Sequence, residues 1–273
     1  DVGLRFYTYY VSMYYLMQTC GKYGKSVVIL DRPNPNGFYI DGPILDQGFK
    51  SNVGLLPIPV VHGLTLGELA KMILGEGWLG AGGNCDLTVI PCENYTHSGL
   101  YEIKTAPSSN LKTMEAIFLY PSTCLFENTL VSPGRGTENP FAIFGSPYLP
   151  DNPDYDHIFI PVSMEGAKNP PFEGEECFGK DLSDTPIQEL TKGEIDLSYL
   201  IKAYRDVKQL YPDLDFFGKP DGKGRYWIDY LMGTDRVRKM ITEGADPETI
   251  RDSWKEDLKE FEKLRAKYLI YGE

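Results

Sequence analysis

The amino-acid sequence predicts an α/β fold built on a parallel sheet, and three neighbouring segments support this. Residues 27–30, Val-Val-Ile-Leu, form a short β-branched run of the kind found in buried strands. Residues 65–74 begin with Thr65 and carry Glu68 three positions later, the capping-box pattern at the start of an amphipathic helix. Residues 86–91 form a second strand-like run after a glycine-rich turn. Strand, helix and strand in this order are typical of a parallel sheet.

Helices are predicted before and after this unit. Residues 5–21 are apolar on nearly every face and end at Gly21, which predicts a helix buried between layers. A short helix is expected after the second strand, and residues 157–162 alternate as a strand does. The C-terminal part predicts three more helices, at residues 198–209, 235–243 and 247–268.

A change of composition indicates two domains. Pro and Asp become frequent at residues 148–155, as in a linker or subdomain boundary. We therefore expect a first domain at residues 1–147, which contains the sheet, and a second at 148–273, which ends in a long helix. The length of 273 residues is sufficient for both to have a core.

Charge and cysteine usage exclude several functions. The net charge of −12 argues against nucleic acid or an anionic membrane surface as the main partner. The five cysteines are dispersed without a CxxC pair, which favours buried free thiols over a disulfide framework or a zinc site. No glycine-rich nucleotide-binding motif is present. The sequence therefore predicts neither a metal nor a nucleotide cofactor.

The loop that follows residues 27–30 is the first candidate binding region. Asp31 and Arg32 come directly after the strand, and the prolines and glycine of residues 33–37 enforce a rigid turn. Asp41 precedes a second break at Gly42. Ligands of open α/β sheets bind outside the carboxyl ends of the strands, where such loops gather. The alternative is a solvated connection that the prolines merely stiffen.

A second charged region lies at residues 124–147, where Glu127 and Arg135 stand on either side of a Ser-Pro-Gly turn. Paired carboxylates suit glycoside hydrolysis, and arginine suits a ligand carboxylate or phosphate. There are structural alternatives to these binding roles. Asp31 and Arg32 would then form an ion pair that supports the fold, and Glu127 would cap a helix. His62 is the best placed of the three histidines, although a lone histidine is as often structural as catalytic.

Several motifs occur together and in order along the chain: residues 1–3 with 5–9, 30–35, 41–43, 53–55 with 57–59, 62–63, 65 with 67–70, 124–127, 134–137, 140–141, and the ending Trp254, Leu258, Phe261, Tyr268, Leu269 and Tyr271. Together they resemble the bacterial exo-acting β-N-acetylmuramidases, a glycoside hydrolase family long catalogued as a domain of unknown function. The resemblance covers essentially the whole chain.

The resemblance implies a fold and an activity. It implies a Rossmann-like domain, a parallel sheet with helices on both faces, that is N-terminally incomplete here, together with a smaller α+β C-terminal domain and a cleft between them. It implies release of terminal N-acetylmuramic acid from the non-reducing end of peptidoglycan fragments, without a cofactor. That substrate implies that the protein is located outside the cytoplasm, either in the periplasm or secreted. The family's upstream Gly-Pro-Glu-His-Gly motif has no match here, and Asp41 stands where many relatives have Glu.

Roles for individual residues follow from both lines of reasoning. Asp41 and Glu127 are the candidate catalytic carboxylates. The substrate-binding candidates are Asp31, Arg32, Asn34, His62, Asn110, Tyr120, Arg135 and Thr137. We expect Arg135 to pair with a ligand carboxylate, which its flanking glycines favour, or with Glu127 or Asp31. A non-catalytic protein that binds muropeptides or cell-wall saccharides is the alternative function.

Overall fold

The computed structural model describes residues 1–80 and 83–272, which form two compact units. Unit 1 comprises Asp1–Glu102, Leu231–Thr234 and Asp252–Glu273, whereas unit 2 comprises Ile103–Tyr230 and Asp235–Arg251. The chain thus leaves unit 1 twice, after Glu102 and after Thr234, and returns to it twice. The boundary predicted after residue 147 falls within unit 2.

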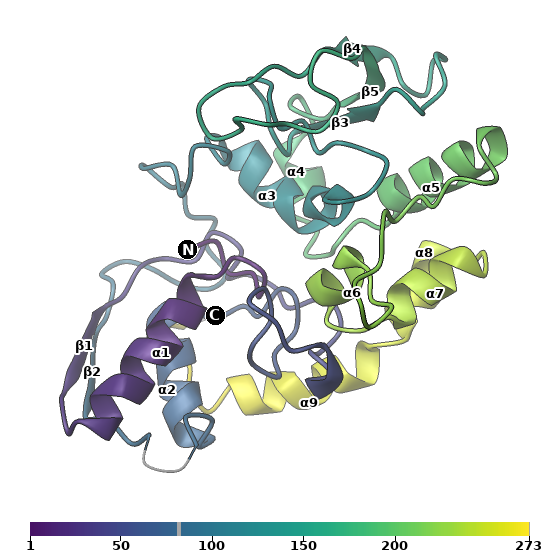
Figure 1. Cartoon of the computed structure of the whole chain (residues 1–273). Helices are drawn as coiled ribbons and strands as arrows, with labels where there is room; N and C mark the ends of the chain where they lie inside the picture. Colours follow the sequence, from purple (N-terminus) through teal and green to yellow (C-terminus); the bar gives the residue numbers. More distant parts are fainter. Residues whose placement is uncertain (81–82, 273) are drawn as a thin grey trace. The chain divides into compact units, whose positions relative to one another are not determined.

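Unit 1 contains the predicted parallel sheet. Strand β1 (Val27–Leu30) pairs with β2 (Leu87–Ile90) in parallel, with Val27 opposite Leu87. Helices α1 (Tyr9–Lys22) and α2 (Leu66–Gly75) lie beside these strands (Figure 1). The capping box of Thr65 and Glu68 is present at the start of α2, as predicted. The chain therefore has a mixed α/β fold with a parallel sheet.

The two faces of this sheet differ. Val27 is buried, but the outward side chains Val28, Leu30 and Ile90 are exposed. The prediction of a fully buried strand is therefore wrong, because one side of the β1–β2 pair has no cover within the described residues. Helix α1 was also predicted to be buried all round, but only Tyr10 and Met17 of this helix are buried. Helices on both faces of the sheet, as in a Rossmann-like domain, stay a prediction.

The core of unit 1 lies between α1, α2 and the loops after β1. It includes Tyr10, Met17, Leu56, Ile58, Leu64, Leu69, Met72 and Ile73, with Phe261 of the C-terminal helix α9 (Lys255–Arg265). Arg5 is fully buried, and its guanidinium donates to the carbonyls of Pro43, Ile58 and Leu231. A short 3₁₀ turn, η1 (Gln47–Phe49), lies in the loop region.

Unit 2 combines a small antiparallel sheet with helices. Strands β3 (Ile143–Ser146), β5 (Cys177–Asp181) and β4 (His157–Phe159) are ordered β3-β5-β4. Helix α3 (Met114–Thr123) precedes them and runs into the 3₁₀ turn η2 (Cys124–Phe126). The remaining helices are α4 (Ile187–Leu190), α5 (Ser198–Leu210), α6 (Trp227–Met232), α7 (Arg236–Thr242) and α8 (Pro247–Asp252).

The predicted helix at residues 247–268 is interrupted. It consists of α8 and α9, which are separated at Trp254, whose φ of −123° is not helical. The Trp254 side chain is buried and donates a hydrogen bond to Asp41, so tertiary contacts outweigh the helical periodicity here. All five cysteines are free thiols, and Cys85, Cys124 and Cys177 are buried. Among the described helices, none has the length and apolar character needed to cross a membrane.

Candidate active site

Asp31 stands at the carboxyl end of β1, and its carboxylate is fully engaged within unit 1. Its Oδ1 accepts hydrogen bonds from the backbone N–H of Gly67 (2.8 Å) and of Arg32 (3.0 Å). Its Oδ2 accepts from the hydroxyls of Thr65 (2.6 Å) and Tyr271 (2.8 Å). A carboxylate at the N-terminus of α2 is also favoured by the helix dipole. Gly67 is required there, since a Cβ would lie 2.7 Å from Asp31 Oδ2.

The next residues of this loop divide into an exposed cation and a buried amide. Arg32 is exposed and makes no ion pair among the described residues. Asn34 is buried, with its Nδ2 donating to the carbonyl of Leu64 and its Oδ1 accepting from the N–H of Asn36. Asn34 therefore fixes the proline-rich turn, while Arg32 is available to a ligand.

Asp41, the first candidate carboxylate, is buried and held in one orientation. Its Oδ1 accepts hydrogen bonds from the N–H of Gly42 (2.7 Å) and from the indole Nε1 of Trp254 (2.9 Å). Its backbone pairs with Val61 in an isolated antiparallel bridge. The Asp-Gly-Pro loop is therefore braced from both sides.

His62 follows Val61 and is also buried, with 1% of its surface exposed. Its Nδ1 accepts a hydrogen bond from the N–H of Leu64, so the neutral ring carries its proton on Nε2. That Nε2 has no partner within the described part of the chain. Burial lowers the pKa of His62 to about 3. A buried donor without an acceptor costs about 1–3 kcal/mol and calls for a functional explanation.

One buried pair in unit 1 was not predicted. His97 Nδ1 lies 3.0 Å from the carbonyl of Gly37, and its Nε2 lies 3.0 Å from Glu68 Oε1. Glu68 Oε1 also accepts from the N–H of Ile270. Burial acts to raise the pKa of Glu68, but the hydrogen bond from His97 and its other donors outweigh burial and lower it. No local motif places His97 beside Glu68, because only the fold brings residues 68, 97 and 270 together.

Glu127 and Arg135 form an ion pair in unit 2. Arg135 donates from Nε (3.0 Å) and Nη2 (2.5 Å) to the same oxygen, Glu127 Oε1. Burial acts to lower the pKa of Arg135, but the Glu127 carboxylate outweighs burial and raises it. Glu127 is thus one of the partners predicted for Arg135, whereas the favoured pairing with a ligand stays a prediction. Glu127 Oε2 has no hydrogen bond among the described residues.

Aromatic rings support this pair. The Arg135 guanidinium lies 5.0 Å from the ring centroid of Phe141, and that ring meets Tyr120 edge-on at 4.6 Å. Tyr120 is buried, and burial raises its pKa well above the usual value. Thr137, in the same turn as Arg135, donates its hydroxyl to the carbonyl of Gly134 at 2.6 Å. Three predicted site residues, Tyr120, Glu127 and Arg135, are therefore brought together.

The Glu127 cavity, about 560 Å³, is lined by Glu127, Arg135, Asn128, Tyr148 and Phe172, among others. Asn128 and Phe172 have φ of 59°, in the left-handed region that non-glycine residues rarely adopt, and Phe141 has φ of 68°. Backbone strain of this kind costs about 1–3 kcal/mol per residue and clusters at functional sites. The sequence pattern did not indicate Asn128, Tyr148 or Phe172 as site residues, because a strained backbone conformation cannot be predicted from the spacing of residue types.

The predicted site residues thus fall into two groups. Asp31, Arg32, Asn34, Asp41 and His62 belong to unit 1, whereas Asn110, Tyr120, Glu127, Arg135 and Thr137 belong to unit 2. Asn110 lies apart from the Glu127 cavity, and its side chain donates to the carbonyl of Gly166. Within residues 1–80 and 83–272, no group of three His, Cys, Asp or Glu side chains is placed to hold a metal ion.

Two family models match this chain. Residues 1–115 match the model described as exo-β-N-acetylmuramidase NamZ, N-terminal, and residues 118–271 match its C-terminal counterpart. The chain is 36% identical over 284 aligned positions to the peptidoglycan β-N-acetylmuramidase NamZ of Bacillus subtilis (strain 168). That alignment covers 99% of this chain and 66% of the relative, so the chain spans slightly less than two thirds of the relative's length.

Solved structures agree. A DUF1343 family protein from Bacteroides fragilis is 50% identical, with a TM-score of 0.91 over all of this chain and 74% of that one. A second DUF1343 family protein from the same organism is 25% identical, with a TM-score of 0.79 over 99% of this chain and 73% of that one. The resemblance seen in the sequence motifs is confirmed, and the chain belongs to the exo-β-N-acetylmuramidase NamZ family.

Proposed function

We propose that this chain carries binding and catalytic residues of a peptidoglycan β-N-acetylmuramidase. The reaction is release of terminal N-acetylmuramic acid from the non-reducing end of peptidoglycan fragments. Family membership supports the reaction class, because the Bacillus subtilis relative is a peptidoglycan β-N-acetylmuramidase. The observation that carries the proposal is the Glu127–Arg135 ion pair at the edge of a cavity lined by aromatic rings.

Glu127 has the properties of a base or nucleophile. Arg135 holds Oε1 with two N–H groups, while Oε2 has no hydrogen-bond partner among the described residues. Hydrolysis of a glycoside requires a second carboxyl group to protonate the leaving oxygen or to assist water. Asp41 of unit 1 remains the other proposed catalytic carboxylate, and within that unit Gly42 and Trp254 fix its Oδ1.

Recognition of the sugar requires a cation for the lactyl carboxylate of N-acetylmuramic acid. Arg135 is already engaged by Glu127, whereas Arg32 is exposed and makes no ion pair among the described residues. We therefore assign the lactyl group to Arg32. Because peptidoglycan lies outside the cytoplasmic membrane, we also propose a periplasmic or secreted location.

The test is hydrolysis of a chromogenic β-N-acetylmuramide by the full-length protein, compared with the matching β-N-acetylglucosaminide. We expect turnover of the muramide, and at least a tenfold lower kcat/KM for an Arg32→Gln variant, about the value of one charge-assisted hydrogen bond. Cleavage of the glucosaminide alone would contradict the substrate assignment.

A non-catalytic saccharide-binding protein is the second candidate. It is favoured by Asp41, which stands where the resemblance places Glu in many relatives and whose Oδ1 is already engaged by Gly42 and Trp254. Calorimetry with muramic-acid saccharides separates the two functions. Binding without release of sugar, by a protein that is folded and full-length, would support the second.

A further inference from the structure

A second cavity of about 510 Å³ lies beside α5 in unit 2. We call it the α5 cavity, and it shares no lining residue with the Glu127 cavity. Helix α5 presents one face to it, with residues spaced by three, four and seven positions: Ser198, Ile201, Lys202 and Arg205. Its volume is in the range of small-molecule sites.

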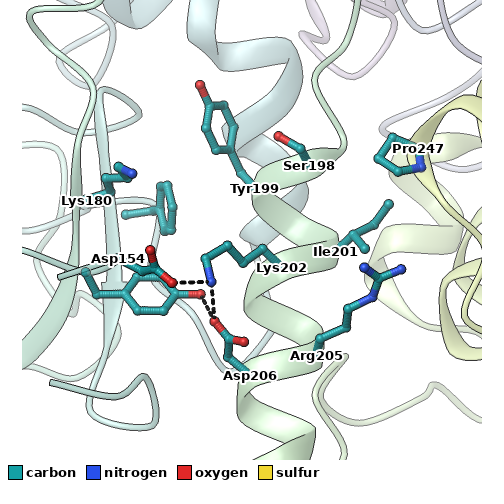
Figure 2. A pocket seen from close by; sticks show the side chains of 11 residues that line it. Asp154, Lys180, Ser198, Tyr199, Ile201, Lys202, Arg205, Asp206 and Pro247 are labelled. Carbon is teal, nitrogen blue, oxygen red and sulfur yellow. Dashed lines mark hydrogen bonds and ion pairs between the residues drawn. The ribbon is translucent and has the colours of Figure 1, made fainter. Parts of the chain in front are cut away.

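One lysine neutralises both acidic side chains of the α5 cavity. Lys202 Nζ lies 2.8 Å from Asp154 Oδ2 and 3.0 Å from Asp206 Oδ2. The hydroxyl of Tyr155 also donates to Asp206 Oδ2, at 2.7 Å. Figure 2 shows the side chains of Asp154 and Asp206 converging on Lys202. The two carboxylates therefore have cationic or hydroxyl partners without any ligand.

Two further cations line the α5 cavity. Arg205 makes no hydrogen bond or ion pair among the described residues and lies on the side of Pro247 (Figure 2). Lys180 of β5 lies on the opposite side and makes no ion pair there, although its charge acts on Asp154. The cavity thus carries three cations and two acids in a chain whose net charge is −12. Such a local excess of positive charge favours an anionic ligand.

An aromatic side chain supplies an apolar surface next to these cations. It is Tyr199, half-buried at the top of the cavity in Figure 2, whereas Phe144 and Tyr155 belong to the lining with only 2% of their surface exposed. Burial raises the pKa of Tyr199 to about 12, so its hydroxyl stays a donor at neutral pH. Aromatic rings beside hydroxyl and guanidinium donors suit a sugar ring with an attached carboxylate better than a bare phosphate.

We propose that the α5 cavity binds a carboxylate-bearing saccharide, with Arg205 as the ligand of the carboxylate. That the saccharide derives from peptidoglycan rests on the proposed function, whereas the preference for a carboxylated sugar rests on the cavity itself. The site lies outside the Glu127 cavity, so it holds a part of the glycan that is not being cleaved.

The experiment is calorimetric titration of the full-length protein with N-acetylmuramic acid, N-acetylglucosamine and inorganic phosphate. It is carried out in the Arg32→Gln background, which weakens binding at the lactyl site proposed in unit 1. Adding Arg205→Gln should weaken binding of N-acetylmuramic acid about tenfold or more, the loss of one charge-assisted hydrogen bond. Lys104→Gln removes an exposed cation of unit 2 outside the cavity and should change nothing.

If the Arg32→Gln protein and the variant that also carries Arg205→Gln bind N-acetylmuramic acid with equal affinity, the α5 cavity is not its binding site. Equal binding of N-acetylglucosamine, or binding of phosphate alone, would overturn the carboxylated saccharide as its ligand. Hydrolysis of the chromogenic muramide is measured separately with the single Arg205→Gln variant and should match the wild type. Absence of hydrolysis in every protein would therefore count against the proposed function, and leave the Arg205 comparison to decide on the α5 cavity.

Discussion

At the scale of single residues, the free oxygen of Glu127 is the feature on which the chemistry depends. Arg135 occupies Oε1, so replacing the carboxylate by an amide keeps the shape and removes the base. We expect Glu127→Gln to reduce kcat about 10²–10⁴-fold with little change in melting temperature. The control is Glu138→Gln, since Glu138 belongs to the same loop but is exposed. Equal losses in both variants would refute a specific role for Glu127.

Arg135 has two possible roles that a Lys substitution distinguishes. Lys keeps the charge but cannot donate two N–H groups to Glu127 Oε1 or stack on Phe141. We expect Arg135→Lys to lower the free energy of unfolding by about 1–2 kcal/mol and to leave the preference for muramic acid over N-acetylglucosamine unchanged. A selective fall in affinity for muramic acid would instead support the ligand pairing that the flanking glycines favour.

His62 should make stability depend on pH. Its folded-state pKa is lowered from 6.5 to about 3, so between these values the unfolded chain binds a proton that the folded chain does not. Stability from this group is therefore full above pH 6.5 and is lost as the pH falls towards 3. His62→Asn keeps an acceptor for Leu64 N–H without that proton. Melting temperature should fall less steeply from pH 6.5 to 4.5 in the variant; parallel curves would contradict this.

Sequence reasoning found part of the candidate site at this scale. The Gly-Arg-Gly turn pointed to Arg135, and its partner Glu127 was near in sequence. Phe172 was not found because it lies 45 positions beyond Glu127, and its positive φ depends on tertiary packing. Arg32 is exposed and Asn34 is buried. Both are polar residues of the same loop, so the sequence does not indicate which of them is buried.

At the scale of elements, Asp31 joins the end of β1 to the start of α2 and to the C-terminal segment. The carboxylate now accepts hydrogen bonds from the Gly67 N–H and the Thr65 hydroxyl, among others. In Asp31→Asn, the amide NH2 would replace one of the accepting oxygens and would face a donor instead of an acceptor. We expect a loss of about 2–3 kcal/mol in the free energy of unfolding, from chemical denaturation. Asp86→Asn, at an exposed position beside β2, is the control and should cost little. Similar costs for both would disprove the bridging role.

Elements were predictable where the signal is local. The capping box and the two β-branched runs placed α2, β1 and β2 closely. The single helix expected at residues 247–268 failed at Trp254, because an apolar stripe can continue while a buried indole leaves the helical conformation to reach Asp41. Helix α1 is apolar all round in sequence, yet its exposed Tyr15 and Leu16 show that composition alone does not fix burial.

At the scale of the whole molecule, unit 1 is completed by a segment that returns after most of unit 2. Trp254 belongs to that segment, and its contact with Asp41 spans 213 positions. A loop of Pro and Asp at residues 148–155 suggested a boundary in sequence, but no local pattern can reveal that residues 252–273 rejoin the first unit. Such long-range closure depends on which buried surfaces fit together.

Because each unit has its own buried core, damage to one core should be confined to that unit. Trp254→Ala removes a fully buried ring and the indole donor to Asp41, and should cost about 3–5 kcal/mol. Amide hydrogen exchange, followed by mass spectrometry, should then accelerate in β1, α2 and α9, with unit 2 unchanged. Phe216→Ala is the matched change in unit 2, where Phe216 is 1% exposed, and should give the opposite pattern. Accelerated exchange throughout the chain in both variants would show instead that the two units unfold together.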